Sequence, residues 1–100
     1  DYILCLISGD QRCSLNKLKQ ILDKKNVSMA KPENVKEITG YTIGGVSPIG
    51  HLNKVDVFID SSLERFTSLF AAAGHPNCVF KINFKDLQKI TNGSIKEIAE

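Results

Sequence analysis

The sequence has no tryptophan, one methionine, three prolines and two tyrosines among its 100 residues. Its longest apolar runs, residues 2–7 and 69–73, fall far below the roughly 18 residues that a membrane-spanning helix requires. No basic and then apolar leader precedes a cleavage site, so we expect neither a membrane segment nor a secretion signal. The chain begins with Asp1 rather than Met, and we expect its natural N-terminus to lie upstream.

Cysteine is scarce and irregularly spaced. Cys5, Cys13 and Cys78 form no Cys-x-x-Cys pair, are odd in number, and are accompanied by only two histidines. This pattern supports neither a disulfide framework nor a zinc site. We therefore expect no metal and no other cofactor, and a reducing, cytoplasmic setting.

Strong charge of one sign is also missing. Thirteen basic and eleven acidic residues give a net charge of +2, which is too little to indicate nucleic-acid binding by itself. Six lysines gather between Lys17 and Lys36, where Asp23, Glu33 and Glu37 offset them only in part. The stretch could attract a phosphate backbone, but a solvated helix face is the commoner arrangement.

What is present is the composition of one globular domain, with 42% hydrophobic and 24% charged residues. We expect a single domain over residues 1–100 with one shared core, and a mixed α+β fold. Its five phenylalanines (58, 66, 70, 80 and 84) are expected in that core rather than on a base-stacking platform, because they follow the pattern of buried strands. Expected strands cover residues 2–8, 27–30, 55–60, 69–73 and 78–84; expected helices follow Ser14, Lys31, Asp60 and Asn83, with a short helical tail after Gly93.

Residues 41–52 form a glycine-rich, almost uncharged loop. The adjacent Gly44 and Gly45 allow backbone angles that other residues avoid, and main-chain amides can approach a ligand there without a Cβ in the way. An oxyanion hole or an anion-binding nest needs this arrangement. The loop is neither a Walker loop nor a dinucleotide fingerprint, because the following residues and the glycine spacing differ. On spacing alone, an ordinary turn-rich connection is an equally good interpretation.

A second group of small residues ends a predicted strand at Ala73 and Gly74, and the turn that follows carries His75, Pro76 and Asn77. Small side chains suit a compact pocket, and a turn histidine can act as a general base when a partner lies within hydrogen-bond reach. An exposed turn histidine without a role is the commoner case. Ser47 has no neighbouring base, and the cysteines are better interpreted as small buried side chains than as nucleophiles.

Together, the two groups resemble the signature of the YbaK/prolyl-tRNA editing family of aminoacyl-tRNA deacylases, related to the insertion domain of bacterial prolyl-tRNA synthetase. The resemblance rests first on residues 39–41 and on Gly-Gly-Val-Ser-Pro-Ile-Gly at 44–50, a fairly specific string. It continues through residues 57–60 and 73–77 and covers essentially the whole chain. Further matching positions are Leu63, Asp86, Leu87, Thr91 and Gly93.

The resemblance implies a barrel-like mixed sheet with surrounding helices, and hydrolysis of the ester between a wrongly attached amino acid and the 3′ end of a transfer RNA. The backbone amides of Gly44, Gly45 and Val46 would face the ester, and water would attack it. The substrate would be prolyl-tRNA carrying a wrong small amino acid, and prolyl-tRNA synthetase a further partner; neither DNA nor a membrane is implied. The implied substrate-binding residues are Ser47, Pro48, Ile49, Gly50, His51, Ala73, Gly74 and His75.

The chain also departs from the family pattern. The family's functional lysine lies on a strand before the region matching residues 2–8, so an N-terminal helix and strand are expected to be missing. The basic, glycine-rich turn of the cysteine-deacylating branch is replaced by residues 74–77, so the amino acid removed stays open. Two alternatives therefore accompany the deacylase: a non-catalytic module that binds aminoacyl-tRNA or a protein, and an editing domain excised from a synthetase.

Overall fold

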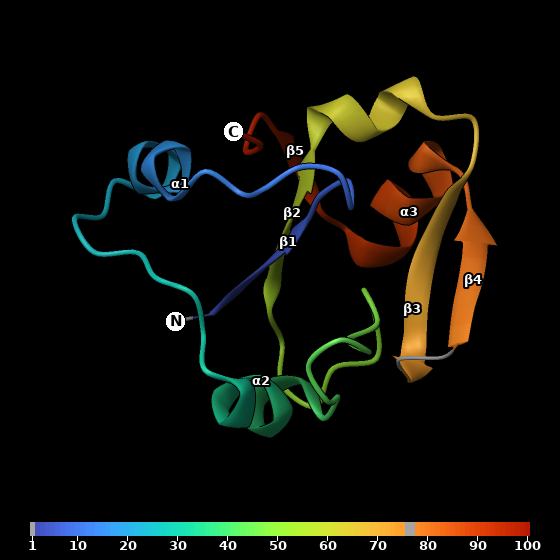
Figure 1. Cartoon of the computed structure of the whole chain (residues 1–100), viewed down its shortest axis with the longest axis horizontal. Coiled ribbons are helices and arrows are strands. Elements are labelled where there is room, and N and C mark those ends of the chain that lie inside the picture. The colour runs from blue at the N-terminus through green and yellow to red at the C-terminus, as the bar shows by residue number, and fades with distance from the viewer. Residues whose placement is uncertain (1, 76–77) are drawn as a thin grey trace.

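The computed structural model describes residues 2–75 and 78–100 of the chain. Helices and strands alternate irregularly along the chain, and the strands form two separate sheets (Figure 1). The strands are β1 (Ile3–Leu6), β2 (Asp56–Asp60), β3 (Leu69–His75), β4 (Cys78–Ile82) and β5 (Ser94–Lys96). The helices are α1 (Leu15–Leu22), α2 (Pro32–Thr39), the 3₁₀ helix η1 (Ser61–Arg65) and α3 (Phe84–Thr91).

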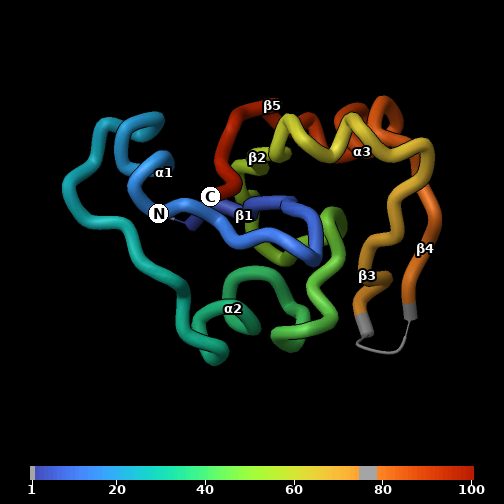
Figure 2. The backbone as a smooth tube through the Cα atoms, turned by 45° about the horizontal axis from the view of Figure 1, so that its top comes forward, coloured from blue at the N-terminus to red at the C-terminus, as the bar shows by residue number. Residues whose placement is uncertain are grey.

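The first sheet has the order β1-β2-β5, and both of its strand pairs are parallel. Ile3 lies opposite Asp56, and Phe58 lies opposite Ser94. The second sheet is the antiparallel hairpin of β3 and β4, which stands beside α3 at the opposite end of the molecule from α1 (Figures 1 and 2). Parallel pairing of β1 with β2 requires a long crossover, and residues 7–55, which include α1 and α2, provide it.

One core joins the two sheets and α3. Its buried members are Val57 and Ile59 of β2, Leu63 of η1 and Leu87 of α3. Partly buried side chains from β1, from both hairpin strands and from the start of α3 complete it; these are Leu4, Leu6, Leu69, Ile82 and Phe84. Six of the nine described elements contribute to this cluster, whereas α1, α2 and β5 supply none of its residues.

The helices begin and end where the local sequence predicts. Ser14 accepts a hydrogen bond from the Lys17 amide at the start of α1, and Asn83 accepts one from the Asp86 amide at the start of α3. Pro32 occupies the first turn of α2, and Gly40 ends that helix with a φ of 84°. These caps depend on residues three or four positions apart, so the sequence alone defines them.

Two expectations about the fold are wrong within the described residues. Residues 27–30 form no strand, and the expected helical tail is β5, whose partner β2 lies more than thirty residues earlier in the chain. The implied barrel is not confirmed, because neither sheet closes on itself in the described part of the chain. In the first two cases pairing between distant segments, rather than local propensity, decides the outcome.

Two of the five phenylalanines expected in the core lie at the surface. Phe66 is 39% exposed and stacks under the Arg65 guanidinium, which lies 4.6 Å from the ring centroid. Phe70 is 69% exposed because the hairpin register places it opposite Lys81, away from the face that carries Leu69 and Ile82. The expectation of a phenylalanine core is therefore wrong for both.

Asp60, at the end of β2, connects the core to the C-terminal segment. Its side chain is 1% exposed, and Oδ1 accepts hydrogen bonds of 2.9 Å from the amides of Ile98 and Ala99. Oδ2 accepts from the Ser62 amide at 3.2 Å and from the Ser62 hydroxyl, as the predicted cap of η1. Burial raises the pKa of Asp60, but these hydrogen bonds together outweigh it and lower the pKa below the usual value of 3.8.

Because the pKa of Asp60 is lower in the folded chain than in the unfolded one, its carboxylate stabilises the fold above the unfolded value. This contribution is lost as the pH falls through the folded-state pKa. We expect Asp60→Asn to lower the free energy of unfolding by about 1–3 kcal/mol at pH 7 and to flatten its decline below about pH 4. Urea unfolding from pH 2 to pH 7 measures both effects. The matched control is Asp56→Asn, at an exposed position of the same strand, and an equal loss there would contradict the assignment.

Candidate functional site

The glycine-rich loop, residues 41–52, leaves the C-terminal end of α2 and returns to it before β2 begins. The Leu52 amide donates to the Thr39 carbonyl at 3.1 Å, and the Asn53 amide donates to the Ile38 carbonyl at 3.0 Å. A Cβ on Gly40 would lie 2.7 Å from Leu52 Cγ, so the two ends pack closely. Both ends of the loop are therefore held at the C-terminal end of α2, which restricts the conformations that the residues between them can adopt.

The three amides predicted to face an ester are not equivalent. The Gly45 amide donates to the Thr42 carbonyl at 2.9 Å and so belongs to a turn inside the loop. The amides of Gly44 and Val46 have no acceptor among the described residues. Gly44 has a φ of 92°, and a Cβ built on it would meet nothing within 4 Å. A ligand oxygen can therefore approach at Gly44 without displacing protein atoms.

Behind these amides, the loop is held by its own polar groups. Ser47 is 5% exposed, and its Oγ accepts a hydrogen bond from the Ile49 amide at 3.3 Å. His51 Nε2 lies 2.6 Å from the Ser47 carbonyl, which can only accept, so Nε2 carries the proton. Neither Ser47 Oγ nor His51 Nε2 is thus available as a base in this arrangement. Pro48 is buried, Val46 is half-buried, and Ile49 and Gly50 are exposed.

Tyr41 brings the loop and the hairpin together. Its hydroxyl donates to the Ile49 carbonyl at 2.8 Å, and its ring meets the edge of His51 with centroids 5.9 Å apart. Gly50 and Gly74 both face this ring. A Cβ would lie 2.7 Å from the Tyr41 hydroxyl oxygen at Gly50, and 2.9 Å from Tyr41 Cε1 at Gly74. The tyrosine therefore fills the space between the two groups that the sequence singled out separately.

Tyr41 belongs to the predicted motif, but the sequence alone assigns it no role. The two glycines are the signal in the sequence, because glycine often stands where no side chain can be accommodated. In the structure both Gly50 and Gly74 have positive φ values, 75° and 94°. The sequence does not reveal which residue packs against these glycines and leaves no room for a side chain. That residue, Tyr41, lies more than thirty positions away from Gly74.

The hairpin contributes Ala73, which is exposed, and Gly74, which is half-buried. The register of β3 and β4 shifts between Ala72 and His75, so the strand is irregular where it meets Tyr41. The side chain of His75, together with Pro76 and Asn77, lies outside the described residues. The roles of His75 and of the loop residues in substrate binding stay predictions.

Other groups that could act as nucleophiles are in poor settings for that role. Burial raises the pKa of the Cys5 thiol to about 12, and the neighbouring Cys13 adds to the rise. Burial likewise raises the pKa of Cys13. Both thiols are therefore protonated at neutral pH and weakly nucleophilic. The described residues contain no cluster of His, Cys, Asp or Glu suited to a metal ion, and no helix among them is long and apolar enough to cross a bilayer.

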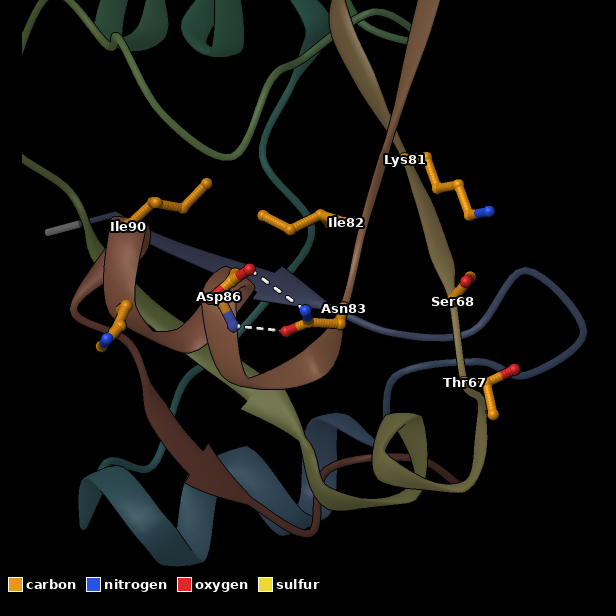
Figure 3. A pocket seen from close by; sticks show the side chains of 8 residues that line it. Thr67, Ser68, Lys81, Ile82, Asn83, Asp86 and Ile90 are labelled. Carbon is orange, nitrogen blue, oxygen red and sulfur yellow. Dashed lines mark hydrogen bonds between the residues drawn. The ribbon is translucent and has the colours of Figure 1, made fainter.

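A cavity lies away from the glycine-rich loop. It has a volume of about 570 Å³ and opens between the hairpin and α3 (Figure 3). Asn83 and Asp86 line it at the start of α3, where Asn83 Oδ1 accepts from the Asp86 amide and Asn83 Nδ2 donates to the Asp86 carboxylate, and Ile82 and Ile90 give it an apolar side. None of the described residues predicted for the site lines it. The cavity and the predicted ester chemistry thus lie in different places.

We expect Tyr41→Phe to lower the free energy of unfolding by about 1 kcal/mol, because the Ile49 carbonyl loses its donor. The ring is retained, so the packing against Gly50 and Gly74 should persist. Thermal unfolding measures the stability, and amide hydrogen exchange at residues 49–51 reports the loosened loop. Tyr2→Phe is the matched control, since Tyr2 is 41% exposed; an equal effect there would remove the special role of the Tyr41 hydroxyl.

Comparison with known proteins connects this geometry to a family. The family model described as the aminoacyl-tRNA editing domain matches residues 1–90. The uncharacterized protein YwhH of Bacillus subtilis is 35% identical over 89% of this chain and 56% of its own length. A candidate Cys-tRNA(Pro)/Cys-tRNA(Cys) deacylase of Enterococcus faecalis, EbsC, is 26% identical over 96% of this chain and 58% of its own length.

A solved structure of the same shape is that of a candidate trans-editing enzyme for prolyl tRNA synthetase. It superposes with a TM-score of 0.93 at 33% identity, over 98% of this chain and 62% of the other. The chain spans little more than half the length of YwhH and of EbsC. The match extends over both the glycine-rich loop and the hairpin, which are the two parts that Tyr41 joins.

Proposed function

Since the chain belongs to the aminoacyl-tRNA editing domain family, we propose that it hydrolyses the ester that joins a wrong small amino acid to the 3′ end of transfer RNA specific for proline. The observation that carries the proposal is that the Gly44 and Val46 amides have no acceptor among the described residues, beside a glycine where a Cβ would meet nothing within 4 Å. The name of EbsC, a deacylase of this kind of substrate, supports it. So does the name of the trans-editing structure.

The chemistry requires stabilisation of an oxyanion rather than a protein nucleophile. When water attacks the ester carbonyl, negative charge develops on the carbonyl oxygen, and preorganised amides lower the barrier. Gly44 and Val46 are the donors offered to that oxygen, while Gly45 keeps the turn in place through Thr42. Ser47 is buried and no base among the described residues is hydrogen-bonded to its Oγ, and Cys5 is protonated, so the proposed attacking group is water. The ester oxygen leaves with the terminal ribose and the carboxylate leaves with the amino acid.

Selectivity for a small amino acid is assigned to the place where hairpin and loop meet. Ala73 and Gly74 carry little or no side chain, and Tyr41 fixes their separation from Gly50. A pocket bounded by such residues admits alanine or cysteine more readily than larger side chains, and His75 borders it in this proposal. Each methylene that such a pocket must accommodate or exclude is worth about 1–3 kcal/mol.

The test uses the purified protein with transfer RNA specific for proline, charged separately with alanine, cysteine or proline and labelled on the amino acid. We expect release of alanine or cysteine above the spontaneous rate, and no release of proline. The same reactions with Gly44→Ala protein control for contaminating hydrolases. Release of none of the three amino acids, with binding of the charged RNA intact, would replace the deacylase with a binding module.

The alternative, an editing domain excised from a synthetase, can be distinguished from an autonomous deacylase by whether activity requires added prolyl-tRNA synthetase. An autonomous deacylase acts without added synthetase, whereas an excised editing domain is expected to act only when prolyl-tRNA synthetase delivers the substrate. Comparing the rate of release with and without that synthetase distinguishes the two. Either outcome tells how the substrate reaches the domain, and both are compatible with the proposed chemistry of the glycine-rich loop.

A further inference from the structure

Positive charge is concentrated in one part of the chain. Residues 17–37 carry six lysines against three acidic residues, while the rest of the chain carries seven basic against eight acidic residues. This stretch therefore carries a net charge of +3, and the rest of the chain carries −1. Four of its lysines, Lys24, Lys25, Lys31 and Lys36, lie on the connection between α1 and α2 and on α2 itself; we call them the basic strip. Asp23, Glu33 and Glu37 lie among them, so residues 23–37 keep a net charge of +1.

The lysines of the basic strip are available to a partner. All four are exposed, and none forms an ion pair with any described residue. Lys17 differs, because its Nζ contacts Glu97 at 3.3 Å and the Ala99 carbonyl at 2.7 Å, which ties it to the C-terminal segment. The strip thus consists of cations that the fold itself does not use.

The strip leads to the glycine-rich loop. The connection from α1 runs along one outer edge of the molecule and enters α2, beside which the loop is seated (Figures 1 and 2). Hydrogen bonds from Leu52 and Asn53 to the last turn of α2 fix the loop to that helix. Eight helical residues span about 12 Å. Lys31 and Lys36 therefore lie within a short, fixed reach of the loop.

We propose that the basic strip contacts phosphates of the transfer RNA acceptor stem while the 3′ end enters the glycine-rich loop. The inference rests on the proposed function, and adds to it the surface that holds the RNA. Phosphate contacts by lysine position a nucleic acid without reading its sequence. The site would thus combine a non-specific electrostatic strip with a selective pocket.

The test compares two double variants that each remove two positive charges from an eight-residue helix or its cap. Lys31→Gln/Lys36→Gln alters the strip on α2, and Lys85→Gln/Lys89→Gln alters exposed positions of α3. Binding of uncharged transfer RNA specific for proline is measured by fluorescence anisotropy from about 20 to 200 mM salt. For the strip variant we expect the slope of log affinity against log salt to become shallower by about 0.7–0.9 for each phosphate that is no longer neutralised. We expect affinity at low salt to fall roughly tenfold or more.

Hydrolysis of an aminoacyl-adenosine ester, which carries no acceptor stem, should be unchanged in the strip variant. Equal weakening in the α3 variant, or an unaltered salt slope in the strip variant, would overturn the inference and return these lysines to a solvated surface. Failure of the proposed function has a different signature. In that case the wild-type protein would leave both charged transfer RNA and the adenosine ester intact, whatever its affinity for the uncharged RNA.

Discussion

Gly44→Ala is expected to abolish most deacylation while leaving the fold nearly intact. A Cβ at Gly44 meets no protein atom within 4 Å, so the new methyl group projects into the space that the ester would occupy. The φ of 92° adds backbone strain of about 1–2 kcal/mol for a residue with a side chain. We expect kcat/KM for mischarged transfer RNA to fall by about 10²-fold, the effect of losing one oxyanion donor. Single-turnover release of labelled amino acid measures the rate, and thermal unfolding measures the stability.

Gly9→Ala provides the matched control for this experiment. A Cβ at Gly9 also meets nothing within 4 Å, but its φ is not positive and it lies outside the glycine-rich loop. Its rate and stability should both stay close to wild type. If Gly44→Ala loses activity only in proportion to its loss of folded protein, the loop is an ordinary turn-rich connection and the amides of Gly44 and Val46 have no catalytic role.

Gly74→Ala is expected to have the largest effect on stability. The added Cβ would lie 2.9 Å from Tyr41 Cε1, and the φ of 94° is itself unfavourable for alanine. Strain and overlap together should cost about 2–3 kcal/mol, which lowers the Tm of a domain of this size by roughly 10–20 °C. The hairpin must move away from the loop to relieve the overlap. Deacylation should therefore fall even at temperatures where the variant remains folded.

A double-mutant cycle separates the two causes. In a Tyr41→Ala background the ring is gone, so Gly74→Ala should cost only its backbone strain, about 1 kcal/mol. The difference between the two backgrounds measures the contact of Tyr41 with Gly74. The same cost in both backgrounds would show that Tyr41 does not couple the loop to the hairpin. Chemical unfolding of the four proteins gives the values.

Local features of the fold can be predicted from the sequence to a large extent. Ser14 and Asn83 cap α1 and α3, and Gly40 ends α2, because each device acts through residues a few positions apart. The β3–β4 hairpin is predictable for the same reason, since two apolar runs flank a short turn. The order of residues directly determines such interactions between near neighbours.

Elements that depend on distant partners are predicted poorly. The segment after Gly93 has no strong strand pattern and becomes β5 only because β2 offers it an edge. Phe70 is apolar and so is expected in the core, but the hairpin register decides which face it occupies. The implied barrel is likewise not confirmed, since closure requires hydrogen bonds that join the two sheets, and none does so among the described residues. The strand or helix propensity of a short segment is weak compared with the energy of pairing and packing against distant strands.

For the site, the sequence by itself identifies the glycine-rich loop and the small residues of the hairpin, because positive φ values and close approaches require glycine. It also determines a modest net charge with the lysines gathered in one stretch. Only the tertiary structure decides which amides are unpaired and that Tyr41 fills the space between Gly50 and Gly74. The physical reason is that a glycine shows where a side chain has no room, whereas the residue that occupies the space lies elsewhere in the sequence and is brought there by the fold.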